Sequence, residues 1–394
     1  MLLATPYEGL EIHRVEKLVY GRFSLPHAVL STCRSQGGYR EDLAYLGNHQ
    51  SCEPAAHHHK SSLAINDPLA YQAEILNAHG LAPEKTALLG TAANMRLLTI
   101  KTESFAELTL TAAVTGGVET NAARAGDPAV GHEGPDGYYS LDSLVAAKDP
   151  NAGTINILVF VSRPMTKGAM VRGVSLITEA KTCALQELGV NSRYSSNLAS
   201  GTGTDQIGLA ARLLSGVKPL AGGGHHIKMG ELMGRVVKEA VKEVLVRQNG
   251  LTPDRMCSVK IHLERFNRRP DGRYRLSSLE LVNLISQFLS PELAELLANN
   301  YLAFFHDPWV VAATAALAHL KDKFVYGVLP RLIWPEVMGA FAGQLAAAVS
   351  GRLDLAQEYA RDLGPNPVEA LDDQAFLGLA ARALALGLRD KWTS

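Results

Sequence analysis

A polar loop at residues 115–127 carries the densest group of side chains that can bind or act on a ligand. Its sequence, TGGVETNAARAGD, follows an apolar run that is typical of a buried strand. The glycines allow a ligand to approach the backbone, and Asn121, Arg124 and Asp127 supply an amide, a forked cation and a carboxylate. We predict that these three side chains bind substrate. The alternative is a solvated loop in which Arg124 and Asp127 pair locally.

Two further segments combine hydroxyl, amide and charged groups. Residues 153–156, Gly-Thr-Ile-Asn, open another apolar run and make Thr154 and Asn156 candidate substrate-binding residues. Glu179 and Lys181 stand two residues apart in a predicted helix, so they face different partners rather than each other. The small and apolar neighbours of Glu179 predict that it is buried, which would raise its carboxyl pKa toward the range of a general base. A solvated helix face is the alternative.

The segment at 201–205, Gly-Thr-Gly-Thr-Asp, presents two hydroxyls and a carboxylate on a loop that we expect to enter a helix. Main-chain N–H groups in such a loop can hold an anion or an oxyanion, so Thr202 is a candidate catalytic residue. Thr204 and Asp205 are candidate binding residues. The pattern lacks the Lys-Ser/Thr ending of a P-loop and the third glycine of a dinucleotide fingerprint. A plain turn in which Thr204 or Asp205 caps the helix is the alternative.

Histidines occur in two groups. His225 and His226 precede a predicted helix, where His226 can act as an acid or a base near neutral pH, although either can equally be a surface residue. The second group is His49, Cys52 and the triplet at 57–59, whose residue types suit zinc or cobalt but whose spacing matches no usual structural-zinc pattern. We therefore assign no metal ligands, and a metal-dependent hydrolase built on this group is an alternative function.

These segments lie among short apolar runs that end in Gly, Thr, Ser and Asn. Such runs predict buried strands with polar loops at their ends, where mixed α/β proteins place their ligands. The predicted strands lie at 28–32, 87–91, 108–114, 154–161 and 197–200. Helices are predicted at 166–188 and 228–247, and the second carries an amphipathic stripe that must lie on a core.

After Gly250 the composition changes, and from 277 to 388 leucine and alanine recur at helical spacing. Prolines divide this region into five or six predicted helices. We therefore predict an α/β domain over 1–250, with a mixed sheet, helices and polar Gly/Thr loops at the strand ends. A smaller all-α domain of unassigned role follows over 251–394.

Composition narrows the classes of partner. The 394 residues carry a formal charge of −1 and no run dense in lysine and arginine, which argues against nucleic acid and anionic lipid. Four widely spaced cysteines favour free thiols in a reducing compartment. The longest strongly apolar run, 309–318, is shorter than the about 20 residues of a membrane span, and the N-terminus has no signal-peptide pattern. We expect a cytoplasmic protein whose C-terminal helices offer faces for a homo-oligomer.

Five segments, taken in order, resemble those of the adenosylcobinamide amidohydrolase family. They are 115–127, 153–156, 178–181, 201–205 and 226–232. The resemblance implies hydrolysis of the amide that joins aminopropanol to a propionyl side chain of the corrin ring, giving adenosylcobyric acid for cobalamin synthesis. Cobalt enters as part of this corrinoid substrate. The resemblance covers residues 15–250 and gives no function to the C-terminal region or the histidine triplet.

Hydrolysis of an unactivated amide needs a nucleophile, donors for the tetrahedral oxyanion and a proton for the departing amine. We predict that Glu179 or His226 activates water and that Lys181 or the 201–204 loop, with Thr202, stabilises the oxyanion. We predict that Asp205 and the polar residues of 115–127 position the substrate.

Two alternatives stay open. In a covalent route Thr154, Thr202 or Thr204 is the nucleophile and needs a neighbouring base or, after self-processing, a freed amine. In a different functional class, the same loops bind the corrinoid without cutting it, and the protein is a carrier.

Overall fold

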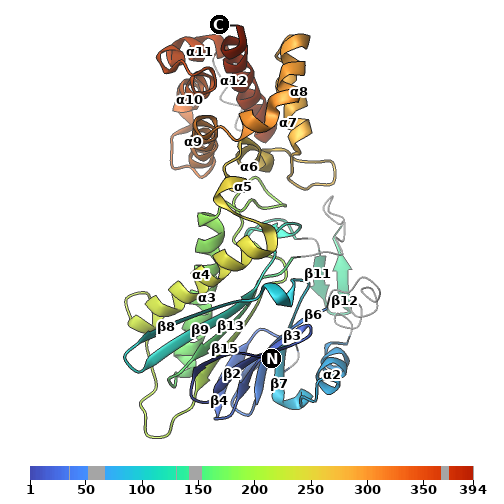
Figure 1. Cartoon of the computed structure of the whole chain (residues 1–394), viewed down its shortest axis with the longest axis vertical. Helices are drawn as coiled ribbons and strands as arrows, with labels where there is room; N and C mark the ends of the chain where they lie inside the picture. Colours follow the sequence, from blue (N-terminus) through green and yellow to red (C-terminus); the bar gives the residue numbers. More distant parts are fainter. Residues whose placement is uncertain (35, 52–66, 130, 142–152, 365–371, 394) are drawn as a thin grey trace. The chain divides into compact units, whose positions relative to one another are not determined.

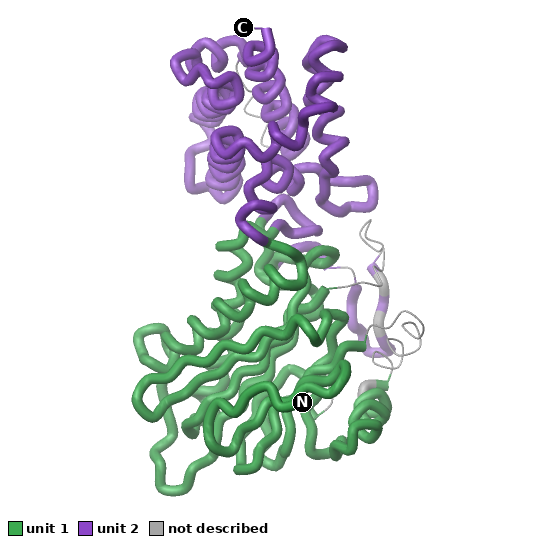
Figure 2. Tube along the Cα trace, in the orientation of Figure 1, with its two compact units in different colours: residues 1–125, 148–190, 198–251 green, residues 126–147, 191–197, 252–394 purple. Residues whose placement is uncertain are grey.

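The computed structural model describes residues 1–34, 36–51, 67–129, 131–141, 153–364 and 372–393. The chain divides into two compact units, each formed by segments that are distant in sequence (Figure 2). Unit 1 comprises Met1–Ala125, Lys148–Val190 and Leu198–Leu251, and unit 2 comprises Gly126–Ala147, Asn191–Asn197 and Thr252–Ser394. The second unit therefore includes two segments from within the predicted α/β region.

Unit 1 contains a five-stranded sheet with the order β1-β2-β3-β6-β7 (Figure 1). Neighbouring strands are antiparallel except β6 and β7, which are parallel. The strands are β1 (Leu2–Tyr7), β2 (Leu10–Val15), β3 (Leu18–Phe23), β6 (Tyr45–Gln50) and β7 (Thr86–Thr91).

A second sheet of six strands has the order β5-β4-β15-β13-β9-β8. Here β13 and β15 are parallel and the other neighbours antiparallel, which confirms the predicted mixed sheet. The strands are β4 (His27–Ser31), β5 (Gly38–Arg40), β8 (Thr99–Phe105), β9 (Leu108–Thr115), β13 (Asn156–Val161) and β15 (Gln206–Arg212). A two-residue ladder joins β10 (Ala122–Ala123) to β14 (Gly201–Thr202).

The two sheets pack face to face, and β13 shows how the sequence produces this. All six of its residues are buried, as a continuously apolar strand predicts. Leu158 and Phe160 join a core with Leu46 of the other sheet. Ile157 and Val159 point the opposite way, into a core shared with two helices. Successive side chains alternate between the faces of a strand, so β13 has an apolar core on each side.

Helices cover both outer faces. α3 (Lys167–Glu187) and α4 (Lys228–Asn249) pack side by side on the six-stranded sheet (Figure 1), and α2 (Pro68–Ala78) packs on the five-stranded one. Thr166 caps α3 by accepting a backbone N–H of its first turn, and α4 ends at Gly250 with φ of 64°. Unit 1 is therefore a four-layer α/β/β/α structure whose main helices lie where the sequence predicts them.

Two predictions near residue 200 are wrong. Residues 197–200 form irregular backbone rather than a strand. The 201–205 segment leads into β15 rather than a helix. Five of the seven residues of β15 are buried, as expected for a strand in the middle of a sheet that is covered on both faces. The 201–205 segment therefore lies between the β10–β14 ladder, which includes Gly201 and Thr202, and the start of β15.

Unit 2 is mainly helical. A hairpin of β11 (Gly131–Gly134) and β12 (Gly137–Ser140) precedes the C-terminal helices. These are α5 (Pro253–Met256), α6 (Val259–Leu263), α7 (Ser278–Ser286), α8 (Pro291–Phe305), α9 (Pro308–Val325), α10 (Trp334–Ser350), α11 (Ala356–Leu363) and α12 (Asp373–Thr393). Their apolar faces enclose a core with Phe266, Phe376 and Trp334, which confirms the predicted helical region.

Arg331–Ser350, which contains α10, is the one stretch among the described residues that is long and apolar enough to cross a membrane. Half of it is buried inside the structure. Trp334, Met338 and Leu345 belong to the helical core, and a core helix can meet the same length and composition criterion.

Candidate active site

Polar segments from distant parts of unit 1 meet at one end of the six-stranded sheet because of the strand directions. β9 runs antiparallel to β13, so Thr115 at the end of β9 pairs with Asn156 at the start of β13. β13 runs parallel to β15, so Asn156 also pairs with Gln206 at the start of β15. The loop after β9 and the loops before β13 and β15 therefore lie together.

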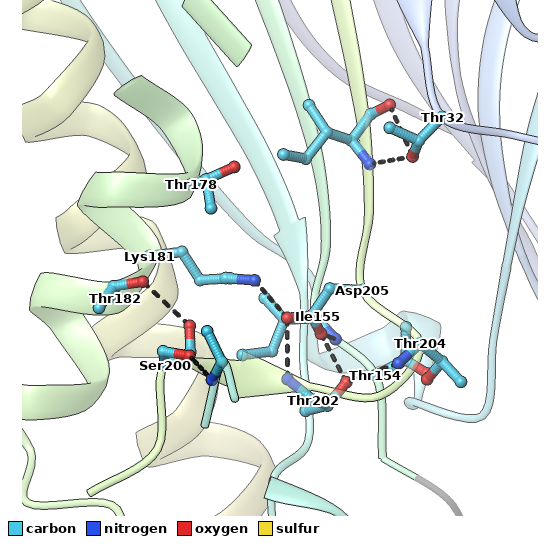
Figure 3. Close-up of polar contacts among 12 residues, drawn as sticks. Thr32, Thr154, Ile155, Thr178, Lys181, Thr182, Ser200, Thr202, Thr204 and Asp205 are labelled. Atoms are coloured by element: carbon cyan, nitrogen blue, oxygen red, sulfur yellow. Dashed lines mark hydrogen bonds and ion pairs between the residues drawn. The ribbon is translucent and has the colours of Figure 1, made fainter. Parts of the chain in front are cut away.

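Asp205 is the centre of this group (Figure 3). Its Oδ1 accepts hydrogen bonds from Ile155 N at 2.9 Å and Thr202 Oγ1 at 2.6 Å. Its Oδ2 accepts one from Thr202 N at 2.9 Å and forms an ion pair with the Lys181 ammonium. The Lys181 and Asp205 side chains are 9% and 10% exposed. With four donors around it, the carboxylate fixes α3, the start of β13 and the 201–205 loop together.

Gly201 makes this arrangement possible. A Cβ at this position would lie 2.5 Å from Asp205 Oδ2 and 2.7 Å from Lys181 Nζ. Both atoms belong to the buried ion pair and cannot move away freely. At Gly203, in contrast, a Cβ would meet no atom within 4 Å. Only the first glycine of the Gly-Thr-Gly-Thr segment is therefore required by packing.

A second group of hydroxyls surrounds the peptide bond between Gly153 and Thr154. Thr204 Oγ1 lies 2.5 Å from Thr154 Oγ1 and 3.2 Å from the Gly153 carbonyl oxygen. Asn121 Nδ2 donates to the same carbonyl oxygen at 2.5 Å. The structure thus brings together Asn121, Thr154 and Thr204, three of the predicted binding residues.

Asn156 lies close by but is fully buried. Its Nδ2 donates to Asn48 Oδ1 at 2.8 Å and to Gly90 O at 2.9 Å, both in the five-stranded sheet. Asn48 Nδ2 donates in turn to Thr115 Oγ1 at 2.8 Å. Asn156 therefore joins the two sheets. Our sequence analysis missed Asn48, although an amide inside the buried stretch of β6 could have indicated it.

Arg124 and Asp127 have partners outside the Asp205 group. Arg124 Nη1 donates to Leu198 O at 3.2 Å within unit 1. Asp127 belongs to unit 2, where Ser192 Oγ donates to its Oδ2 at 2.6 Å. The two residues thus fall in different units although they are three positions apart.

The structure does not bring Glu179 and His226 to this group. The prediction that Glu179 is buried is wrong, because its side chain is 46% exposed and pairs with the exposed His225 at 2.7 Å. On a helix, the position two residues before Lys181 faces a different direction, here toward solvent. His226 is also exposed. Lys228, two residues later, has its Nζ 4.9 Å from the centre of the Phe105 ring. Phe105 pairs with Leu108 at the start of β9, whereas Thr115 is at the end of that strand.

The histidine-rich group offers little that the structure describes. Cys52 and the triplet at 57–59 lie outside the described residues. His49 is buried, and its Nδ1 lies 2.6 Å from the Tyr71 hydroxyl. Within the described ranges, no group of three histidine, cysteine, aspartate or glutamate side chains is placed to hold a metal ion.

Comparison with known proteins gives the context for this geometry. The family model described as adenosylcobinamide amidohydrolase matches residues 3–253. The chain belongs to this family. An uncharacterized protein of Methanocaldococcus jannaschii is 36% identical over 233 residues, which are 58% of this chain and 85% of that protein.

The family match places the Asp205 group within the amidohydrolase region. The matched range contains Lys181, Thr202 and Asp205, together with the peptide between Gly153 and Thr154. It ends one residue after unit 2 resumes at Thr252, so almost all of the C-terminal helical region lies beyond it. The name of the family describes a hydrolase that acts on an amide bond.

Proposed function

We propose that this protein hydrolyses the amide between aminopropanol and the corrin propionyl group of adenosylcobinamide. The products are adenosylcobyric acid and free aminopropanol, and the reaction returns a salvaged corrinoid to cobalamin synthesis. The match of the adenosylcobinamide amidohydrolase family to residues 3–253 carries this proposal. The chemistry of the Asp205 group supports it, as does a site built from neutral amides and hydroxyls, because a corrinoid is fringed with amide groups.

Because Glu179 and His226 lie outside the Asp205 group, we no longer propose them as the catalytic residues. The Asp205 group offers the Thr202 hydroxyl as a nucleophile or as a guide for water, and the Lys181 ammonium as a positive charge. A positive charge in a buried site stabilises the oxyanion of a tetrahedral intermediate strongly. We therefore assign the chemistry to Thr202 of this group and to Thr154 and Thr204 of the neighbouring group, supported by Lys181.

The first test is incubation of the purified, tag-free full chain with adenosylcobinamide, followed by mass-resolved chromatography of the corrinoids. Conversion to adenosylcobyric acid is the expected result. A parallel incubation with a chelator reports whether the protein needs a bound metal. A folded protein that binds the corrinoid without releasing aminopropanol would contradict hydrolysis and favour a carrier.

Matched variants on α3 locate the chemistry. We expect Lys181→Met to lower turnover by at least about 100-fold, as the loss of an oxyanion donor does. Glu179→Gln should change turnover by less than about fivefold, since an exposed ion pair contributes less than about 1 kcal/mol. Thr178→Ala is the control, since the Thr178 hydroxyl donates to Val174 O of its own helix at 3.0 Å. A large loss from Glu179→Gln would return the catalytic role to that carboxylate.

A further inference from the structure

The peptide bond between Gly153 and Thr154 is surrounded as a reacting amide would be. Its carbonyl oxygen accepts hydrogen bonds from Asn121 Nδ2 at 2.5 Å and Thr204 Oγ1 at 3.2 Å. Two donors aimed at one carbonyl oxygen polarise the bond and stabilise negative charge that develops on that oxygen. The bond is followed directly by a threonine, whose hydroxyl can attack the preceding carbonyl carbon through a five-membered ring.

The hydrogen bonds also provide a path along which protons can move. A hydroxyl has one proton to donate, and Thr204 donates its proton to Gly153 O. Either hydroxyl can donate in the contact of 2.5 Å between the two threonines, and when Thr204 donates to Gly153 O, the Thr154 hydroxyl is the donor to Thr204. The result is a relay that runs from the Thr154 hydroxyl through Thr204 to the carbonyl oxygen of Gly153.

The backbone on both sides of this bond is held in place. A Cβ on Gly153 would lie 2.1 Å from Gly117 O and 3.0 Å from Asn121 Oδ1, so only glycine fits before Thr154. On the other side Ile155 N donates to Asp205 Oδ1 at 2.9 Å. Thr154 itself is 4% exposed, so its hydroxyl is largely shielded from bulk water. Such fixed positioning is what an intramolecular attack requires.

Asn121 gives an independent indication. Its Oδ1 is buried and has no hydrogen-bond partner among the described residues. The same atom borders the Gly153 position at 3.0 Å from where a Cβ would lie. A buried amide oxygen without a donor is costly. An ammonium group formed at Thr154, the residue after Gly153, is the donor that we propose for this oxygen.

We propose that the chain cleaves its own backbone between Gly153 and Thr154, and that Thr154, as a new N-terminal residue, is the nucleophile for the amide substrate. The cleavage does not depend on the identity of the substrate. The role of the new terminus rests on the proposed amidohydrolase function.

The cleavage needs no reagent except water. Thr154 Oγ attacks the Gly153 carbonyl carbon while its proton passes to Thr204 Oγ1 and the Thr204 proton passes to Gly153 O. The C–N bond then breaks as the proton of the new hydroxyl moves to nitrogen, which leaves an ester and a free α-amine. Water hydrolyses the ester to a Gly153 carboxylate and restores the Thr154 hydroxyl. The α-amine then lies beside that hydroxyl and can serve as its base.

Intact mass of the purified full chain tests the cleavage without any substrate. We expect two products, residues 1–153 and 154–394, whose summed mass exceeds that of the uncut chain by one water. N-terminal sequencing of the second product should begin Thr-Ile-Asn. A single uncut mass after prolonged incubation would overturn the proposal, as would cleavage at another bond.

Variants separate self-cleavage from cleavage by a contaminating protease. Thr154→Ala should stay uncut, and Thr154→Ser, which keeps a hydroxyl, should be cut. Thr204→Val should slow the cut by at least about 100-fold because it removes the relay. Thr178→Val on α3 is the control and should be cut like the parent chain. Circular dichroism checks that each variant is folded. A cut in Thr154→Ala, or a parent-like rate in Thr204→Val, would contradict the mechanism.

The corrinoid assay on the same samples distinguishes this inference from the proposed function. A cut chain that does not convert adenosylcobinamide would leave self-cleavage standing and remove the proposed function. An uncut chain that converts adenosylcobinamide would support the proposed function and overturn self-cleavage. If cleavage creates the nucleophile, turnover should rise in step with the cut fraction, and a constant turnover would overturn the role of the new terminus.

Discussion

Asp205 and Lys181 depend on each other unequally. Without Lys181, Asp205 keeps its hydrogen bonds from Ile155 and Thr202. Without the Asp205 charge, the Lys181 ammonium is left in a buried position without its counter-charge. Breaking a buried ion pair by removing one partner typically costs about 3–5 kcal/mol. The stability of the site should therefore depend more on the carboxylate than on the ammonium.

We predict that Asp205→Asn lowers the free energy of unfolding by about 3 kcal/mol and that Lys181→Met lowers it by less. Urea denaturation of both variants measures the difference. The double variant should be more stable than Asp205→Asn alone, because it removes the uncompensated charge. A larger loss from Lys181→Met than from Asp205→Asn would contradict this account of the pair.

His27 makes stability depend on pH. Its Nδ1 donates to Leu25 O at 2.8 Å, so its Nε2 is left to accept from the Tyr7 hydroxyl at 3.1 Å, and the ring is neutral. Burial lowers the pKa of His27 to about 4, and it also raises the pKa of Tyr7. A histidine that the fold keeps neutral favours folding above its unfolded pKa of about 6.5, and this contribution is lost as the pH falls toward 4.

We predict that unfolding free energy falls by about 2 kcal/mol between pH 7 and pH 5 through His27 alone. Denaturant titrations of the parent and His27→Gln at both pH values measure it. The variant starts from a lower stability, but its own loss between the two pH values should be smaller by that amount. Equal losses would show that another group causes the dependence.

At the scale of elements, the ladder between β10 and β14 connects the loop after β9 to the Asp205 group through Gly201. We predict that Gly201→Ala lowers both stability and turnover, because the added methyl meets the buried ion pair. Gly203→Ala, two residues away in open space, is the matched control. Thermal unfolding and the corrinoid assay measure both effects. A harmless Gly201→Ala would show that the ion pair has room to move.

Much of the architecture could be predicted because periodicity is a local property. The apolar run of β13 and the three- and four-residue spacing in α4 are visible in the sequence, and both elements form where predicted. The irregular backbone at 197–200 could not be predicted, since the hydrophobic pattern of four residues is too short to distinguish a buried strand from a buried loop. The pairing of β6 with β7 across distant sequence was equally hidden.

The candidate site was predicted in part for the same reason. Its loops follow or precede strands, so Asn121, Thr154 and Asp205 could be selected as polar residues at strand ends. Their grouping depends on the antiparallel step from β9 to β13 and the parallel step from β13 to β15, which residue types do not encode. Glu179 was misjudged because a one-residue difference in helix phase decides between a core and solvent.

At the scale of the whole molecule, the segment Asn191–Asn197 belongs to unit 2 although the strand and helix on either side of it belong to unit 1. Asn191 Nδ2 donates to Ile261 O at 2.8 Å, and Tyr274 N donates to Arg193 O at 3.0 Å. Arg265 donates to Ser196 O and also pairs with Asp322. The C-terminal region therefore holds this segment by several specific bonds.

We predict that a chain ending at Leu251 is less stable by on the order of 3 kcal/mol, since each of the three hydrogen bonds named above contributes about 1 kcal/mol. Trypsin should cut the shortened chain at Arg193 faster than the full chain. Unchanged protection at Arg193 would contradict the role of these bonds. Light scattering on both chains tests whether the C-terminal helices also form a homo-oligomer. The homo-oligomer and the cytoplasmic location both stay predictions.

The bond from Asn191 to the C-terminal region has a consequence for synthesis on the ribosome. Its partner Ile261 follows 70 residues later. At elongation rates of about 5–20 residues per second, Asn191 is added to the chain about 4–14 seconds before Ile261. Throughout that interval the nascent chain can assemble strands up to β13 and Ser192 can bind Asp127, but 191–197 lacks its partners from the C-terminal region. Completion of this part of the chain is therefore timed by translation, and a premature stop after β15 releases a chain that lacks the C-terminal partners of 191–197.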